Sequence, residues 1–277
     1  MNIDSPIVAS LQELVSAIPS GAKLAIPKDT SGAAMAATQA LVRLGRRDLH
    51  LVCVPVGGLQ ADILIGAGCV KTIETSAVSL GEFGAAPRFL AAIKAATMQI
   101  LDATCPAIYA GLQAAEKGLP FIPLRGIIGS DLLKQRDDWR VIDNPFQAND
   151  KIVALAAIKP DVALFHAPLA DRFGNVFIGR ERELMTMAHA AHATLVTVEE
   201  ICEHNLLLDD ARAGAVIPAL YISAIAEAKR GAWPLGFHDQ YGDDEATLAR
   251  YAALAQTQQG FDQFIAEWSA EPVASAA

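Results

Sequence analysis

The chain has 277 residues, 52% of them hydrophobic and 19% charged, which excludes a disordered or low-complexity protein. Its formal net charge of −9 argues against partners such as nucleic acid or an anionic membrane surface. No apolar run reaches the roughly 18 residues that a membrane helix needs. The N-terminal stretch MNIDSPIVAS lacks the basic flank of a signal peptide, so a cytoplasmic protein is expected.

The first half of the chain alternates between helical and extended patterns. Four apolar residues share one face of a helix over residues 10–18, and the continuous apolar run 49–56 is typical of a strand covered on both sides. Further strands are expected at residues 23–27, 70–77 and 98–104, and further helices at 33–45, 89–96 and from Pro106 to about Gly118. This is a βαβ rhythm.

The second half continues the rhythm and ends in helices. Buried strands are expected at residues 121–126, 151–158, 161–168 and 193–201, a helix at 183–193, and one or two helices between Asp243 and Trp268. The sequence therefore predicts an α/β fold, with a mostly parallel open sheet and helices on both faces. We expect a single domain over residues 1–277 with a C-terminal helical segment from about residue 243.

Ligands of open parallel sheets bind where the strands end at their carboxyl edge and the connections fan apart. The loops that follow the predicted strands are therefore the places to look for a site. These loops are PKDTSG, VGG, SLGEFG, ATCP, LRGIIGSD and HAPLADRFGN.

Four blocks in order, VGG..AD.LIGAG.V, SLGEFG..PRF, GLQAA..GLPF.P.RG..GSDLL and HAPLADRFGNV..G, carry a family resemblance. The chain resembles the A, or alpha, subunit of class I coenzyme A transferases, in the branch that includes glutaconate CoA-transferase. The resemblance extends from about residue 20 to about residue 200. It implies an α/β subunit that forms an αβ or α2β2 complex with a beta subunit. It also implies a CoA thioester as substrate and no permanently bound cofactor.

The resemblance implies a reaction in which a glutamate carboxylate attacks an acyl-CoA, forms an anhydride, and takes CoA as a glutamyl thioester. CoA then passes to a second carboxylic acid. A carboxylate nucleophile conserves the energy of the thioester if water is kept out. The glutamate lies in the beta subunit, typically within Ser-Glu-Asn-Gly, and this chain contains no such sequence. Complete activity is therefore expected only with a beta subunit.

Glu82 in SLGEFG is the supporting carboxylate candidate within this chain. Its loop is expected at the strand-end edge, where Ser79 and Gly81 would also contact substrate or CoA. An alternative role for Glu82 is to cap the helix that begins near Pro87. Both roles stay open.

Arg125 follows a predicted strand and could hold a carboxylate or a CoA phosphate in a bidentate way. Gly126, Gly129 and Ser130 of the same run are candidates for the same binding site. Arg125 could equally form an internal ion pair with a neighbouring acid. Arg88 and Arg180 are weaker candidates of the same type.

His166, Asp171 and Asn175 lie in HAPLADRFGN and are candidates for substrate or CoA binding. The competing interpretation is structural, because Asp171 could bond nearby backbone and Gly174-Asn175 suits a turn between strands. A buried histidine satisfied by its surroundings is the common alternative for His166.

Two departures from the family pattern bear on function. Many alpha subunits carry a glycine-rich stretch after the first strand, but here only Gly32 remains in PKDTSG, with Lys28, Thr30 and Ser31 as donors. The alternative is that Asp29, Thr30 or Ser31 only caps the next helix.

The second departure is Cys105. Several relatives carry a glutamate at that position, and in related hydrolases that open steroid-derived rings on CoA thioesters this glutamate is implicated in catalysis. Cys105 precedes Pro106 at a helix start, where the dipole favours a thiolate, although a small buried hydrophobe is the other interpretation.

No metal site is expected. His189 and His192 share a helical face, and Cys202 and His204 flank an acid, but neither set has the ligand count of a known motif. The cysteines are scattered and expected to stay reduced. The rival functions are a CoA-thioester hydrolase on the same scaffold and a non-catalytic ligand-sensing domain.

Overall fold

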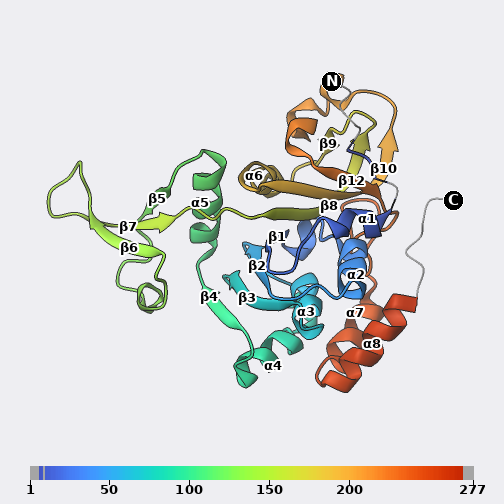
Figure 1. Cartoon of the computed structure of the whole chain (residues 1–277), viewed down its shortest axis with the longest axis horizontal. Coiled ribbons are helices and arrows are strands. Elements are labelled where there is room, and N and C mark those ends of the chain that lie inside the picture. Colours follow the sequence, from blue (N-terminus) through green and yellow to red (C-terminus); the bar gives the residue numbers. More distant parts are fainter. Residues whose placement is uncertain (1–5, 9, 271–277) are drawn as a thin grey trace.

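The computed structural model describes residues 6–8 and 10–270, and a nine-stranded sheet forms its centre (Figure 1). Most strands run parallel, in the order β12–β10–β8–β1–β2–β3–β4, while β9 and β11 add antiparallel pairs beside β8. The strands of this sheet are β1 (Lys23–Pro27), β2 (Leu49–Val54), β3 (Val70–Thr75), β4 (Gln99–Asp102), β8 (Val162–Asp171), β9 (Val176–Phe177), β10 (Ala193–Cys202), β11 (Val216–Ile217) and β12 (Ala224–Glu227). The predicted mostly parallel α/β sheet is confirmed.

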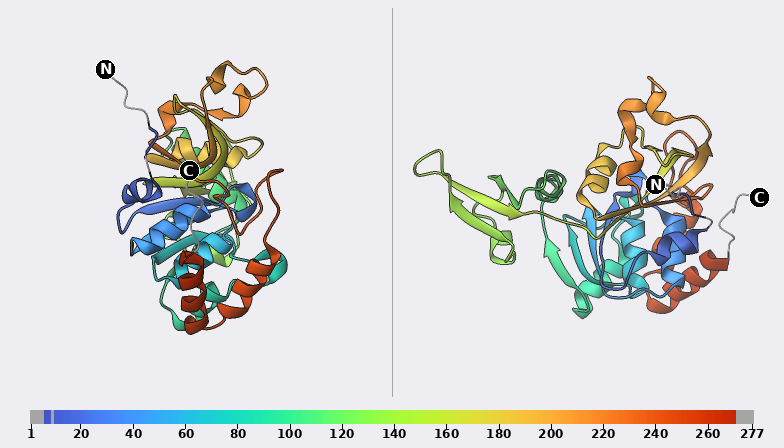
Figure 2. Two further views of the ribbon diagram at one scale, coloured as in Figure 1. Left: turned by 90° about the vertical axis from the view of Figure 1, so that its right-hand side faces the viewer. Right: turned by 45° about the horizontal axis from the view of Figure 1, so that its top comes forward.

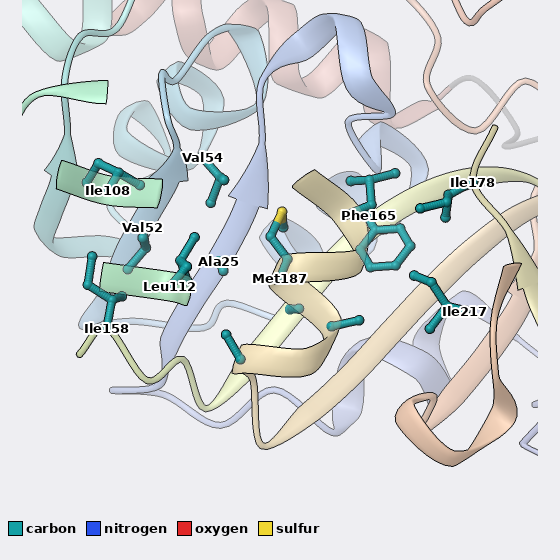
Figure 3. Close-up of a cluster of buried hydrophobic side chains, with 14 of the residues drawn as sticks. Ala25, Val52, Val54, Ile108, Leu112, Ile158, Phe165, Ile178, Met187 and Ile217 are labelled. Atoms are coloured by element: carbon teal, nitrogen blue, oxygen red, sulfur yellow. The ribbon is translucent and has the colours of Figure 1, made fainter. Parts of the chain in front are cut away.

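Helices cover both faces of the sheet, because successive residues of each strand point to opposite faces and both sets are apolar. Ala25, Val52 and Phe165 pack on one face under α5 and α6 (Figure 3). Leu24 and Ile26 pack on the other face, in a cluster with residues of α1 to α4. These helices are α1 (Leu11–Ser16), α2 (Met35–Arg43), α3 (Leu59–Gly66), α4 (Pro87–Ala95), α5 (Cys105–Glu116) and α6 (Arg182–Ala190).

The C-terminal helices α7 (Glu245–Leu254) and α8 (Gln258–Ala270) pack against α2 and α3. Tyr251 and Phe261 fill this third cluster together with Met35 and Ile63. Figure 1 shows α7 and α8, in red, beside α2 and α3. Among the described residues, no helix is both long and apolar enough to cross a membrane.

Residues 119–157, here called the arm, do not belong to the central sheet. They form a separate antiparallel sheet in the order β5–β7–β6, which projects from the body (Figure 2, right). Its strands are β5 (Phe121–Leu124), β6 (Trp139–Asp143) and β7 (Lys151–Ala156). The expectation that residues 121–126 and 151–158 are buried strands of the parallel sheet is therefore wrong. Exposure alternates along β5, as in an antiparallel sheet with one solvated face.

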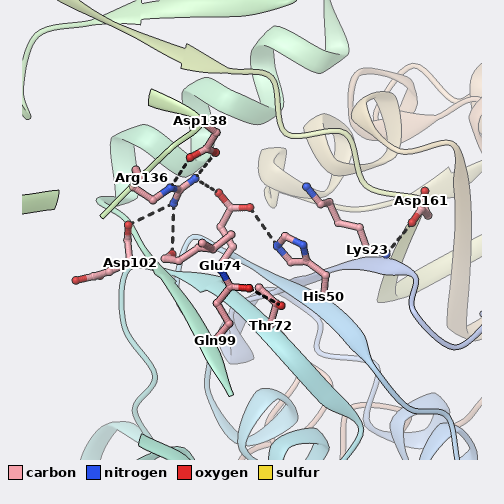
Figure 4. Close-up of polar contacts among 10 residues, drawn as sticks. Lys23, His50, Thr72, Glu74, Gln99, Asp102, Arg136, Asp138 and Asp161 are labelled. Carbon is pink, nitrogen blue, oxygen red and sulfur yellow. Dashed lines mark hydrogen bonds and ion pairs between the residues drawn. The ribbon is translucent and has the colours of Figure 1, made fainter. Parts of the chain in front are cut away.

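A buried ion cluster joins the arm to the body (Figure 4). Arg136 of the arm donates to Glu74 of β3 at 2.5 Å and to Asp138 at 2.7 Å. The side chains of Arg136 and Glu74 are only 1% and 2% exposed. Burial alone would raise the pKa of Glu74, but His50 and Arg136 outweigh it and lower that pKa. The arm is therefore fixed at its root by a charge-compensated pair.

Candidate active site

A pocket of about 710 Å³ lies at the carboxyl ends of β1, β2 and β3. Three of the loops singled out in the sequence, PKDTSG, VGG and SLGEFG, meet there, as expected for an open parallel sheet. The pocket is lined by residues 28–30, 56–59, 77, 79–83, 180, 235–238, 241–243, 248 and 251.

Asp29 connects the loop after β1 to the start of α3. Its Oδ2 accepts the N–H of Leu59 at 2.7 Å, and the N-cap residue Gly58 offers no side chain for that purpose. A Cβ on Gly58 would lie 2.0 Å from Asp29 Oδ2, so only glycine allows this approach. The expectation that this loop caps the next helix, α2, is wrong, because Asp29 caps α3 instead and α2 has no side-chain cap.

The carboxylate of Asp29 is electrostatically unusual. Burial raises its pKa from 3.8 to about 6, and the hydrogen bonds from the N–H groups of Leu59 and Gln60 offset this only in part. The nearby acids Asp62 and Asp243 push the pKa in the same direction as burial. Oδ1 is buried and has no hydrogen-bond partner among the described residues. Such an uncompensated acid in a pocket is a candidate functional group.

The cations of the pocket already have acidic neighbours. Lys28 Nζ lies 3.1 Å from Glu183, and Arg180 Nε lies 3.4 Å from Glu181. The buried Ser31 hydroxyl lies 2.5 Å from Glu183 and 2.9 Å from Glu181, at the start of α6. Lys28, Thr30 and Ser31 therefore lie where the sequence placed them, but Ser31 faces α6 and not the pocket.

Ser79, Gly81 and Glu82 all line the pocket. Ser79 Oγ accepts the N–H of Gly81 at 3.2 Å and holds the turn, while Gly81 adopts a φ of 60°. Glu82 is exposed and makes no hydrogen bond or ion pair with the described residues. The capping alternative for Glu82 is wrong, because Asp62 accepts the N–H groups of Arg88 and Phe89 at the start of α4.

The remaining wall comes from residues 235–251, which sequence reasoning missed. Leu235, Phe237 and Tyr241 lie in the loop between β12 and α7. The stretch WPLGFHDQYGDD, with glycine, proline and aromatic residues together, was the available signal. Because β12 is only four residues long, the loop after it could not be assigned to the sheet edge.

Glu199 of β10 holds this wall in place. It accepts the hydroxyl of Tyr241 at 2.7 Å and the N–H of Arg230 at 2.7 Å. His166 Nε2 lies 2.8 Å from the same carboxylate, and its Nδ1 lies 2.9 Å from Thr197. Burial opposes ionisation of Glu199, but His166 and Tyr241 outweigh it and lower its pKa.

His166 is therefore a satisfied, fully buried histidine that does not line the pocket. Its ring packs against Phe237, with the ring centroids 4.5 Å apart, so it supports the wall from behind. Gly32 packs directly against β8 at His166. A Cβ at position 32 would lie only 2.2 Å from the His166 carbonyl oxygen, so there is room for glycine alone. Direct ligand contact by His166 is not supported by this geometry.

Asp171 and Asn175 are buried in the turn between β8 and β9. Asp171 accepts the N–H groups of Phe173, Asn175 and Leu206 at 2.8 to 2.9 Å. Asn175 accepts the N–H of Ala219 at 3.0 Å. The structural interpretation of this turn is the one that the geometry favours, since these groups are occupied by the protein itself.

Arg125, Gly126, Gly129 and Ser130 do not lie at the edge of the parallel sheet. They follow β5 in the arm, and Arg125 forms a bidentate pair with Asp150. Ser130 accepts the N–H of Leu132 at 3.2 Å. Their expected location was wrong because β5 belongs to the antiparallel sheet, and none of the four lines the pocket.

Arg88 and Cys105 lie outside the pocket lining. Arg88 donates to the carbonyl oxygen of Ala255 at 3.1 Å and so ties α4 to the C-terminal helices. Cys105 is exposed at the start of α5, with its Sγ 3.1 Å from Ser76 Oγ. The interpretation of Cys105 as a buried hydrophobe is therefore wrong.

Comparison with known proteins agrees with this architecture. The family model described as coenzyme A transferase matches residues 8–228. The A-type subunit of the 3-oxoadipate CoA-transferase of Pseudomonas knackmussii is 31% identical over 84% of this chain and 82% of that protein. A cholesterol ring-cleaving hydrolase subunit of Rhodococcus jostii is 29% identical over 84% of this chain and 81% of that protein.

The A-type subunit of the glutaconate CoA-transferase of Acidaminococcus fermentans is 32% identical over 84% of this chain and 78% of that protein. The crystal structure of that enzyme superposes with a TM-score of 0.88, covering 96% of this chain and 89% of the other. The resemblance carried by the four sequence blocks is confirmed by these matches. The chain belongs to the coenzyme A transferase family, within its A-type subunits.

Proposed function

We propose that this chain and a B-type subunit together move CoA between an acyl-CoA and a carboxylic acid. The two relatives named as transferases are both A-type subunits by name, which supports a two-subunit enzyme, αβ or α2β2. The observation that carries the proposal is the pocket itself. It lies at the ligand-binding edge of the parallel sheet, and apolar side chains form much of its wall.

The nucleophile in this proposal is a glutamate of the partner. Its carboxylate oxygen attacks the thioester carbonyl and expels CoA as a thiolate, which leaves an acyl-glutamyl anhydride. The thiolate then attacks the glutamyl carbonyl, the free carboxylate departs, and a glutamyl-CoA thioester remains. The acceptor acid reverses both steps and leaves as the new acyl-CoA.

This chain supplies the opposite wall of the site. We assign Ser79, Gly81 and Glu82 to the surface that faces the acyl group, and Tyr241 and Phe237 to the apolar part of the same surface. Such a wall excludes water, and exclusion of water protects the anhydride and the glutamyl thioester from hydrolysis. It also holds the acyl group near the attacking carboxylate.

Hydrolysis on the same scaffold is the alternative, because one relative is a hydrolase subunit. The resemblance places a catalytic glutamate of those hydrolases at the position of Cys105. Here that position offers an exposed thiol beside Ser76. This position therefore lacks the carboxylate that the resemblance assigns to those hydrolases, so transfer is the favoured reaction.

The test is a product analysis with the purified two-subunit complex. The complex receives one acyl-CoA and a different carboxylic acid, and the products are separated by mass. Transfer gives a new thioester of the added acid, whereas hydrolysis gives only free CoA and the first acid. The proposal also expects no transfer by this chain alone, and full transfer by the lone chain would overturn it.

A further inference from the structure

The pocket holds more fixed negative charge than positive charge. Three carboxylates line it, those of Asp29, Glu82 and Asp243, against the two cations Lys28 and Arg180. Each cation has a glutamate of the α6 start within 3.4 Å, as described above. A negatively charged group on a ligand would therefore meet two cations that already lie beside glutamates, and the side chain of Arg180 is 85% exposed, so solvent screens it.

The other titratable groups of the lining do not change this balance. Burial lowers the pKa of His238, so its imidazole is neutral at pH 7. Burial raises the pKa of Tyr241 and of Tyr251, so both phenols keep their protons. With three carboxylates and two cations, the lining side chains carry a net negative charge.

Asp29 is the one of these carboxylates whose pKa burial raises clearly, to about 6. Its partners are the N–H groups at the start of α3, and the acids Asp62 and Asp243 lie close enough to oppose its ionisation. A second carboxylate placed in the pocket would add one more charge of the same sign near Asp29. Like charges at short distance repel each other, and more strongly where protein replaces water around them.

The uncharged part of the wall favours apolar ligands. Val56, Leu80 and Leu235 line the pocket together with Phe83 and Phe237. A pocket of about 710 Å³ is within the range of sites for small molecules, and burial of a hydrocarbon chain against these apolar side chains is favourable.

We propose that this pocket selects an acyl group with an uncharged, apolar chain and rejects a diacid whose second carboxylate would enter it. The inference rests on the proposed function, in which the pocket holds the acyl group. Asp29 and Asp243 are the specificity-determining residues of this proposal, because both line the pocket and carry the same charge as the second carboxylate of a diacid. A pocket carboxylate several ångströms from the second carboxylate of a diacid should change the ratio of kcat/KM between monoacid and diacid by roughly tenfold.

The test compares two acceptor acids of equal length with the two-subunit complex at pH 8, with acetyl-CoA as donor. Hexanoate and adipate differ only in the terminal carboxylate. We expect kcat/KM for hexanoate to exceed that for adipate at least tenfold. Asp29→Asn and Asp243→Asn each move this ratio toward adipate, whereas the matched charge change Asp143→Asn, on the exposed face of the arm, leaves it unchanged.

Three outcomes distinguish failure of the inferred substrate preference from failure of the proposed CoA-transfer function. Preference for adipate, or a ratio that neither pocket variant changes, overturns the inference while transfer itself stands. Release of free CoA without any new thioester overturns the proposed function. In that case calorimetric titration of the complex with hexanoate and adipate still decides the inference, because tighter binding of adipate contradicts it and tighter binding of hexanoate supports it.

Discussion

Two carboxylates, the half-buried Asp29 at the pocket and the buried Glu74 at the root of the arm, differ in what surrounds them. Glu74 is held by the guanidinium of Arg136 and lies near His50, and its pKa is lowered although burial opposes this. Asp29 has only backbone N–H groups as partners, and burial raises its pKa to about 6. Glu74 therefore helps to attach the arm to the body, whereas the ionised form of Asp29 is disfavoured in the pocket.

This difference separates a structural acid from a candidate functional one. Pairing offsets the cost of burying an acid, whereas an acid left uncompensated keeps that cost. An uncompensated acid that persists in a pocket therefore indicates a role in ligand binding or chemistry. Each of the following variants breaks or sharpens the comparison.

The largest effect is expected from Arg136→Met. The substitution leaves Glu74 buried without its cation, and breaking such a pair costs about 3–5 kcal/mol. Urea unfolding followed by circular dichroism measures the loss. Arg125→Met, which removes an exposed pair with Asp150 in the same arm, is the control and should cost far less because solvent already screens that pair. Equal losses in the two variants would contradict a special role for the arm root.

Asp29→Asn should act in the opposite direction and stabilise the chain. The amide oxygen still accepts the N–H of Leu59, but the buried charge is gone. The change from 3.8 to about 6 in the pKa of Asp29 sets an upper limit of about 3 kcal/mol at pH 8. Urea unfolding at pH 8 measures the gain, and a clear loss of stability would show that the charge of Asp29 is compensated after all.

The pH dependence of unfolding follows from the same pKa. Between about pH 4 and pH 6 the folded chain binds a proton at Asp29 that the unfolded chain has released, so this contribution to stability falls as the pH rises. Glu74 acts oppositely, and its contribution is lost when the pH falls below the ordinary value of 4.5 through its lowered pKa. The difference in unfolding free energy between Asp29→Asn and the wild type should grow from pH 4 to pH 6, and a constant difference would exclude the assignment.

The smallest of these effects is expected from Tyr241→Phe. It removes one of the donors to Glu199, while the N–H groups of Arg230 and Gly231 remain. The loss is about 1.5 kcal/mol, the lower end of the range for a hydrogen bond to a charged group, because other donors to Glu199 remain. Amide hydrogen exchange should become faster over residues 230–243, and unchanged exchange there would show that Glu199 does not hold this wall.

Much of the parallel sheet could be predicted from sequence, and the arm could not. Runs such as 49–56 are apolar except for His50 because both faces of β2 are covered, which is the pattern of a parallel strand. The run 121–126 begins with four apolar residues, and periodicity does not tell which sheet such a short run joins. Neither Arg136 nor Glu74 shows in sequence that the two side chains meet.

The sequence predicted those parts of the site that lie in loops directly after parallel strands. SLGEFG and PKDTSG were placed correctly because each follows a parallel strand, and these strands end at one edge. Asp171 ends β8 and Asn175 follows it, but their side chains bond backbone N–H groups, which no sequence pattern distinguishes from ligand binding. The role of Asp29 depends on Gly58, a contact between two loops that only the fold reveals.

The most direct test of the account fills the pocket and measures transfer. Thr30 lines the pocket, is exposed, and makes no hydrogen bond with its side chain among the described residues, so Thr30→Trp occupies the cavity with little cost in folding. Gln147→Trp, on the exposed arm, is the control. We predict that kcat/KM for CoA transfer by the two-subunit complex falls at least tenfold in Thr30→Trp, with an unchanged urea midpoint. Transfer at the wild-type rate with the pocket filled would contradict the central claim that the acyl group binds there.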